Sequence, residues 1–239
     1  MAQTIEKNQY AYDLSGSDYE MIREFDIATG TVIERGEVVY QNLATGYVVS
    51  VGDQDQDDPY LGCAAEDHTG IVNTLNPRSN GLKLRVHCSP TAVFKCKPGI
   101  LSTCDSGTST NWVDGELVAG AGFADDDFTG AYIKLYAKAA ASTLTIPLGT
   151  ILRAADFTVA AGTIIMATGV LTGAASAGDQ VLLFPPRVSK GWDLNSDGNN
   201  LDLKAKGGES IEIVDIDPAT EYVYWKFRLH QFAASQIAI

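Results

Sequence analysis

Strict alternation of apolar and polar residues is the feature that most restricts the fold of this chain. In LKLRVH, residues 82–87, every second residue is apolar, which is the pattern of a β-strand with one buried and one solvated face. Ser89-Pro90 then marks a turn, and Ala92–Cys96 supplies a second strand pattern that ends before Pro98. We therefore predict a β-hairpin over residues 82–96, in a chain that belongs to the all-β class.

The longest alternating segment lies near the other end of the chain, over residues 222–230. Its odd-numbered residues form an apolar face, which we expect to pack in the core, and its even-numbered residues up to 228 form a polar face. The apolar set is Val223, Trp225, Phe227 and Leu229, and the polar set is Tyr222, Tyr224, Lys226 and Arg228. Residues 131–137 alternate in the same way and predict a further strand.

A partial internal repeat suggests how these strands are grouped. The segment 75–98 resembles the segment 194–218, and the same offset of 119 residues carries GTVI at 30–33 onto GTIL at 149–152. We interpret this as a diverged duplication of a small β-barrel or sandwich unit. It predicts an N-terminal arm over 1–29, a first β unit over 30–98, a loop-rich connector with a strand over 99–145, and a second β unit over 146–239.

The N-terminal arm has tyrosines in a polar setting and no sustained periodicity. Residues 18–25 could form one or two helical turns, which would depend on packing because so short a helix is marginal in water. Two interpretations stay open for the arm. It is either a frayed terminus or a clasp that exchanges onto a neighbouring subunit.

Composition limits the classes of function. A chain of 239 residues with 45% hydrophobic residues can bury a sizeable core. Its formal charge of −13 would repel a phosphate backbone, so we expect no nucleic-acid partner. The sequence has neither an apolar run near 18 residues nor a charged-then-apolar leader, so we expect no membrane helix and no secretory signal.

All four cysteines lie in the first half of the chain, at Cys63, Cys88, Cys96 and Cys104. They form no C-x-x-C pair, and their spacing is too wide for a zinc knuckle. We therefore expect buried free thiols in a reducing cytosol rather than a metal site.

From Gly30 onward, short β-branched runs alternate with glycine and asparagine turns, as in a meander or a barrel. In the segment GCAAED, residues 62–67, a strand of small residues begins at a glycine and runs into Glu66-Asp67. This stretch resembles the core of the small β-barrel capsid decoration, or cement, proteins of tailed bacteriophages. The resemblance covers residues 30–70 directly and 149–184 only through the repeat, where Leu182–Pro186 replaces the Glu-Asp turn.

The resemblance implies a structural protein of the virion that binds the outer surface of the phage head, commonly as a homotrimer. Its partner would be the major capsid protein, and it would be made in the host cytoplasm. In that family the 62–67 piece is a structural strand and turn, so no catalytic residue is carried over. A phage tail or baseplate component and a calcium-dependent carbohydrate-binding module are the alternatives.

One segment has the spacing of a calcium loop. Asp193, Asn195 and Asp197 occupy positions one, three and five, and Gly198 occupies position six. Position twelve is Lys204 instead of a bidentate glutamate, so an Asx-rich turn is the alternative interpretation. The acidic residues at 53–58 form a second candidate, either a solvated loop or an ion site.

Aromatic residues of the connector are the candidates for partner binding, because loops usually carry contacts. They are Trp112, Phe123 and Phe128, and the alternative is that they cap the core. The sequence has no Gly-x-Ser-x-Gly, no His-Glu-x-x-His and no phosphate-binding glycine loop. Glu66 and Asp67 are adjacent on a strand and would point to opposite faces, so we expect neither catalysis nor a cofactor other than calcium.

Overall fold

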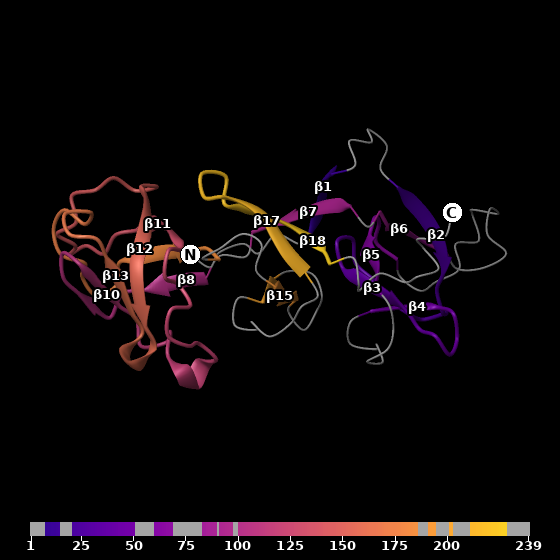
Figure 1. The fold of residues 1–239 in the computed structure, drawn as a ribbon, viewed down its shortest axis with the longest axis horizontal. Helices are drawn as coiled ribbons and strands as arrows, with labels where there is room; N and C mark the ends of the chain where they lie inside the picture. The colour runs from indigo at the N-terminus through magenta and orange to yellow at the C-terminus, as the bar shows by residue number, and fades with distance from the viewer. Residues whose placement is uncertain are drawn as a thin grey trace.

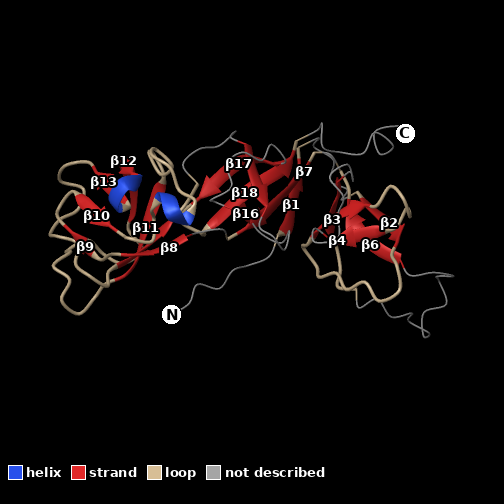
Figure 2. Ribbon diagram, turned by 90° about the horizontal axis from the view of Figure 1, so that it is seen from below, coloured by secondary structure: helices blue, strands red, loops and turns tan. Residues whose placement is uncertain are grey.

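The computed structural model describes residues 8–14, 21–50, 60–68, 83–89, 91–97, 100–185, 191–194, 201–202 and 211–228. These residues form β-strands in three sheets, with 3-10 turns at Ala119–Ala121 and Val159–Ala161. The three sheets follow one another along the long axis of the molecule in two perpendicular views (Figures 1 and 2). The prediction of the all-β class is therefore confirmed. No helix in the described ranges is long and apolar enough to span a membrane.

The five-stranded sheet lies at one end of the molecule (Figure 1). Its antiparallel strands run in the order β2 (Ile22–Asp26), β6 (Lys83–His87), β5 (Tyr60–Ala64), β3 (Val38–Gln41) and β4 (Val48–Ser50). All five residues of β5 are buried, because both faces of the sheet are covered at this strand. Tyr60 and Cys63 belong to a core shared with the neighbouring sheet, whereas Leu61 and Ala64 belong to a second core on the opposite face.

The central sheet has six strands, which come from both ends of the sequence. The order is β1 (Gln9–Asp13), β7 (Ala92–Cys96), β18 (Tyr222–Phe227), β17 (Ile211–Asp217), β15 (Gly191–Leu194) and β16 (Leu201–Asp202). One face carries an aromatic core in which Phe94, Trp225 and Phe227 lie with ring centroids 5.1–5.9 Å apart. The Trp225 indole donates a hydrogen bond to Asn8 Oδ1 at 3.2 Å, so residues 217 positions apart meet in this core.

The third sheet is built from residues 100–183 alone and occupies the other end of the molecule (Figure 1). Its order is β8 (Ile100–Thr103), β14 (Gln180–Leu183), β11 (Tyr132–Ala137), β12 (Ile151–Thr158), β13 (Thr163–Met166), β10 (Asn111–Val113) and β9 (Ser106–Gly107). The chain enters along β8 and leaves along β14, which are paired so that Ile100 lies opposite Leu183. Residues 100–185 therefore form an inserted domain with adjacent ends.

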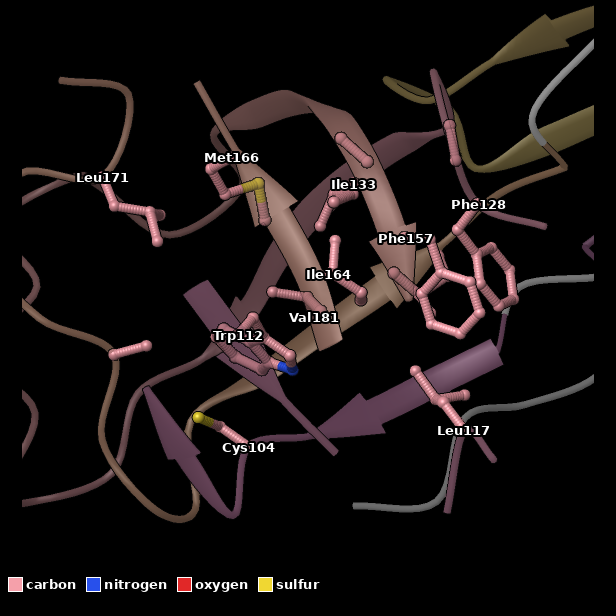
Figure 3. Close-up of a cluster of buried hydrophobic side chains, with 14 of the residues drawn as sticks. Cys104, Trp112, Leu117, Phe128, Ile133, Phe157, Ile164, Met166, Leu171 and Val181 are labelled. Atoms are coloured by element: carbon pink, nitrogen blue, oxygen red, sulfur yellow. The ribbon is translucent and has the colours of Figure 1, made fainter. Parts of the chain in front are cut away.

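The inserted domain has its own core and is also joined to the central sheet. Figure 3 shows the core, which includes Trp112, Phe128 and Phe157. At the junction, Leu182 and Phe184 pack into the core of the central sheet. Lys134 of β11 adds an ion pair of 2.7 Å with Glu221, in the turn between β17 and β18.

The hairpin predicted over residues 82–96 is wrong, although both of its strands are present. β6 pairs with β2 and β5, whereas β7 pairs with β1 and β18. The turn between them carries the chain from one sheet into the next. A turn signal shows where a strand ends, but it does not determine which strand the next one pairs with.

Residues 9–13 and 22–26, within the expected N-terminal arm, are strands of two different sheets of the same chain. The helical turns expected over 18–25 are wrong for the described residues 22–25, which form most of β2. In β2, Phe25 lies opposite Leu84 and packs against the second core of the five-stranded sheet. Cross-strand pairing and packing therefore determine the local structure here.

The sheets also group the chain differently from the four predicted ranges. Strands of the expected connector pair with β12, β13 and β14, and β18 pairs with β7 across the two expected units. About half of the residues in the two repeated segments, 75–98 and 194–218, lie outside the described residues. The matching segments 30–33 and 149–152 are described, and they differ in secondary structure. Residues 30–33 end in an isolated bridge from Ile33 to His68, whereas residues 151–152 begin strand β12. The strand predicted over 131–137 is confirmed as β11.

Candidate binding surface

Two β-bulges shape the outer face of the central sheet, which lies opposite the aromatic core. In β1 the register shifts between Tyr10, which faces Phe94, and Tyr12, which faces Val93. Directly opposed residues lie on the same face of a sheet, so Tyr10 lies on the core face and Tyr12 on the outer face.

The second bulge lies in β17, between Ile213, which faces Trp225, and Asp215, which faces Tyr224. Without it, regular alternation would place Asp215 on the core face with Ile213. The bulge moves the carboxylate to the outer face, beside Tyr224. The two irregularities thus bring side chains from β1 and β17 onto one surface.

These residues line an open hollow of about 640 Å³ across β1, β7, β18 and β17. The residues that line it include Tyr12, Tyr224, Lys95, Asp215 and Asp217. The ring centroids of Tyr12 and Tyr224 are 6.2 Å apart, with an angle of 38° between their planes. Tyr12 is 40% exposed, so a large aromatic surface remains open to solvent.

The polar groups around the hollow carry both signs of charge. The Lys95 ammonium lies 4.6 Å from the centroid of the Tyr222 ring, a cation–π contact. Asp217 accepts hydrogen bonds from the Thr220 hydroxyl at 2.6 Å and from the Ala219 N–H at 3.0 Å. The hydroxyl bond is the main reason that the pKa of Asp217 is lowered, so this carboxylate is ionised near neutral pH.

The Tyr12 phenol remains a proton donor near neutral pH. Its pKa is raised, first by partial burial and then by the negative charge of Asp215. Tyr12, Tyr224 and Asp215 therefore form one electrostatically linked group on the outer face of the sheet.

Asp179 and Asp114 are two of the three buried carboxylates described in the inserted domain, and they lie away from this hollow. Asp179 accepts hydrogen bonds from the Ala139 N–H at 2.7 Å, the Ser142 hydroxyl at 2.9 Å and the Ser176 N–H at 2.9 Å. Asp114 likewise accepts bonds from the Ser102 hydroxyl and from backbone N–H groups. Both carboxylates hold loops in place, and their hydrogen bonds give them a structural role.

The three aromatic residues predicted for partner binding are in the core of the inserted domain. Trp112, Phe123 and Phe128 are all buried, and Figure 3 shows Trp112 and Phe128 among other core side chains. Trp112 Nε1 also donates a hydrogen bond to the Ser102 hydroxyl at 3.0 Å. The structure therefore supports the alternative interpretation, in which these three aromatic residues complete a core.

The predicted calcium loop lies almost wholly outside the described residues. Asp193 is a residue of β15, and Asn195 and Asp197 are not described; nor are the acidic residues at 53–58. Among the described residues, no group of three or more His, Cys, Asp or Glu side chains is arranged to hold a metal ion.

The expectation of buried free thiols is confirmed for all four cysteines. Burial is the main cause of a raised pKa for Cys63, Cys88 and Cys104, with Cys104 reaching about 11. A thiol with so high a pKa is a poor nucleophile, so these groups act as small core residues.

Several large apolar side chains remain exposed in turns. Leu43 is 65% exposed in the turn between β3 and β4, and Leu148 is 59% exposed in the turn between β11 and β12. These turns belong to the sheets at opposite ends of the molecule (Figure 1). Single exposed leucines are normal on protein surfaces, so neither one identifies a partner site by itself.

Sequence reasoning identified part of the hollow and missed the rest. Alternation in residues 222–228 placed Tyr222 and Tyr224 on the outer face, as the structure shows. Tyr12 and Asp215 were missed because each follows a bulge. One signal was available in IEIVDID, residues 211–217, where the apolar spacing changes from two residues to three after Ile213.

Comparisons with known proteins give no assignment for this architecture. No protein-family model, curated protein or solved structure matches the chain. The fold defines an all-β protein with three antiparallel sheets, and its function rests on physical argument.

Proposed function

We propose that this chain is a structural virion protein that decorates the outer surface of a phage head and stabilises the shell. The observation that carries the proposal is the structure of residues 60–67, where strand β5 ends at Ala64 and a bend at 65–66 leads to Asp67. Asp67 accepts a hydrogen bond from the Arg35 N–H at 2.8 Å, and Glu66 accepts one from the Arg85 N–H at 3.2 Å. A strand followed by a hydrogen-bonded turn supports the proposal, because the resemblance to decoration proteins implies these two elements.

The proposed mechanism is adhesion, which needs no catalytic group. An elongated molecule with exposed apolar turns at both ends can contact two neighbouring capsomers at once. A standard protein interface buries about 1,600 Å², and a homotrimer would combine several such contacts into tight attachment. The charge of −13 would also keep decorated particles apart in solution.

Binding to capsids tests the proposal directly. Purified protein is mixed with capsids that lack decoration, and the mixture is sedimented and imaged. We expect the protein to sediment with the capsids, to occupy regular lattice positions and to raise the melting temperature of the shell. Protein that stays in the supernatant at micromolar concentration would refute the proposal.

Two matched variants locate the contact. Leu43→Asp and Leu148→Asp each place a charge at an exposed leucine in a turn, so both should fold normally. We expect at least one to weaken capsid binding, because a charge buried at an interface without a partner is costly. Light scattering of the free protein gives its mass, and a trimer is the expected result.

A further inference from the structure

We propose that the hollow on the outer face of the central sheet binds a neutral carbohydrate through the rings of Tyr12 and Tyr224. The proposal does not depend on a role in the capsid. The hollow has a volume of about 640 Å³, within the range of ligand sites, which is typically about 300–1,000 Å³.

The two tyrosine rings provide the apolar part of the site. A sugar ring has a face of C–H groups that packs on an aromatic ring, while its hydroxyls point outward to polar partners. Tyrosine suits this role because it has an apolar body and a polar tip. With centroids 6.2 Å apart and planes tilted by 38°, the rings present two adjoining surfaces that can hold neighbouring sugar units.

The polar groups favour a ligand that both donates and accepts hydrogen bonds. The carboxylates of Asp215 and Asp217 accept bonds, the Lys95 ammonium donates them, and the Tyr12 hydroxyl, protonated near neutral pH, does both. Sugar hydroxyls match such a mixed set, and hydrogen bonds to charged groups are stronger than those between neutral groups.

The lining of the hollow carries both signs of charge. Asp215 and Asp217 contribute two carboxylates and Lys95 one ammonium, so an anion would meet net negative charge, whereas a cation would be attracted by the carboxylates and repelled by Lys95. A neutral polyhydroxylated ligand can form hydrogen bonds with both kinds of group without bringing like charges together. An anionic glycan is therefore disfavoured, and a lysine-rich peptide is the competing ligand that the test must exclude.

The bulges give an independent reason to treat this surface as a site. Each interrupts a ladder that would otherwise continue, and bulges often re-aim side chains next to functional sites. Here two bulges on different strands move Tyr12 and Asp215 onto the face that already carries Tyr224. Register shifts also occur in the other two sheets, between β11 and β14, β12 and β13, and β3 and β5, so it is the convergence of two of them on one hollow that supports a site here.

The test uses the full-length protein and a glycan array, followed by calorimetric titration with the best neutral oligosaccharide in buffer that contains EDTA. We expect a dissociation constant between about 10 µM and 1 mM, typical of a shallow site for a small polar ligand. Binding in EDTA separates this site from the calcium loop predicted at residues 193–197.

Three variants connect binding to the hollow. Tyr12→Ala and Tyr224→Ala should each weaken binding at least tenfold, and Asp215→Asn should weaken it severalfold. Tyr47→Ala is the matched control, because Tyr47 is 42% exposed in the turn between β3 and β4 and belongs to a different sheet. It should bind like the unmodified protein. Near-UV circular dichroism checks that each variant is folded.

Several results would overturn the proposal. On the array, these results are binding to no neutral glycan, or a preference for sialylated or sulfated glycans. Binding of a lysine-rich peptide in place of a glycan would also overturn it. So would equal glycan affinities of the Tyr12→Ala, Tyr224→Ala and Tyr47→Ala variants. Failure to bind capsids would leave this result unaffected, since the two experiments use different ligands and different variants.

Discussion

The buried carboxylate of Asp179 provides the sharpest test of how the inserted domain is held together. Asp179 is 0% exposed and accepts hydrogen bonds from Ala139, Ser142 and Ser176, which lie in two separate loops. The Asp179→Ala substitution removes all three of these bonds. It leaves the three donors, which are themselves partly buried, without the acceptor that they have in the folded protein.

The expected loss of stability follows from those three donors. Leaving a buried donor unsatisfied costs about 1–3 kcal/mol, so the loss of the acceptor for three donors should lower the free energy of unfolding by roughly 3–9 kcal/mol. Asp179→Asn should cost less, because its amide oxygen can still accept the bonds from Ser142 and Ser176. Its NH₂ group would then face the Ala139 N–H, so one bond is lost and two donors oppose each other.

The measurement is urea unfolding, combined with hydrogen exchange of β14, which follows Asp179 directly. Asp217→Ala is the matched control, since Asp217 also accepts bonds from a hydroxyl and from backbone N–H groups, but in an open turn. Water can replace those bonds, so we expect a loss below about 1 kcal/mol. Equal losses in the Asp179→Ala and Asp217→Ala variants would refute the reasoning that burial makes the Asp179 bonds essential.

Three further predictions concern backbone, thiol and domain. Gly62→Ala should prevent normal pairing of β5 with β6, because a Cβ at Gly62 would lie 1.8 Å from the His87 carbonyl oxygen and the backbone there has a φ of +141°. Gly46→Ala is the control, since Gly46 has a φ of +76° but open space around it. It should lower the stability measured by thermal unfolding by only about 1–2 kcal/mol. Cys104, with a pKa of about 11, should resist thiol reagents at pH 8 until urea unfolds the protein, and rapid labelling of the native protein would contradict this. The contribution of Cys104 to stability should be lost as the pH rises from about 9 towards 11, because the thiol of the unfolded chain ionises first. A fragment of residues 99–186 should fold alone and give dispersed NMR signals, because it contains its own core and its first and last strands pair with each other. The spectrum of a disordered chain would show that the fragment needs the central sheet in order to fold.

Local strand patterns could be predicted from the sequence because alternation directly reflects a half-buried strand. Residues 83–87, 132–137 and 222–227 are strands, and the apolar residues of the last one face the core as expected. The strand predictions need only the residues of one segment. The buried cysteines were expected for a different reason, because their spacing includes no C-x-x-C pair and does not fit a zinc knuckle.

Pairing could not be predicted, since it depends on segments far apart in the chain. β7 lies between β1 and β18, and nothing within residues 92–96 specifies those neighbours. The partial repeat misdirected the grouping because short strand-and-turn patterns resemble one another whatever sheet they join. The aromatics of residues 112–128 were equally ambiguous, since the sequence did not show that their loops surround a separate core.

The candidate site illustrates the same limit on a smaller scale. One side of the hollow follows from alternation in β18, whereas the opposite sides depend on bulges in β1 and β17. A bulge reverses the face of every residue after it, so a period of two gives the wrong face from that point on. The change of apolar spacing after Ile213 is the one trace that this leaves in the sequence.

The origin of the central sheet from both ends of the chain has a consequence during synthesis. When the ribosome has made β1 and β7, the strands β17 and β18 that complete their sheet are still more than 110 residues away. The inserted domain can fold in that interval, while the aromatic face of β7 waits without its partner Trp225. Nascent chains that stall before residue 222 should therefore expose an unpaired strand edge and aggregate, and the whole molecule should become soluble only when its last strands emerge.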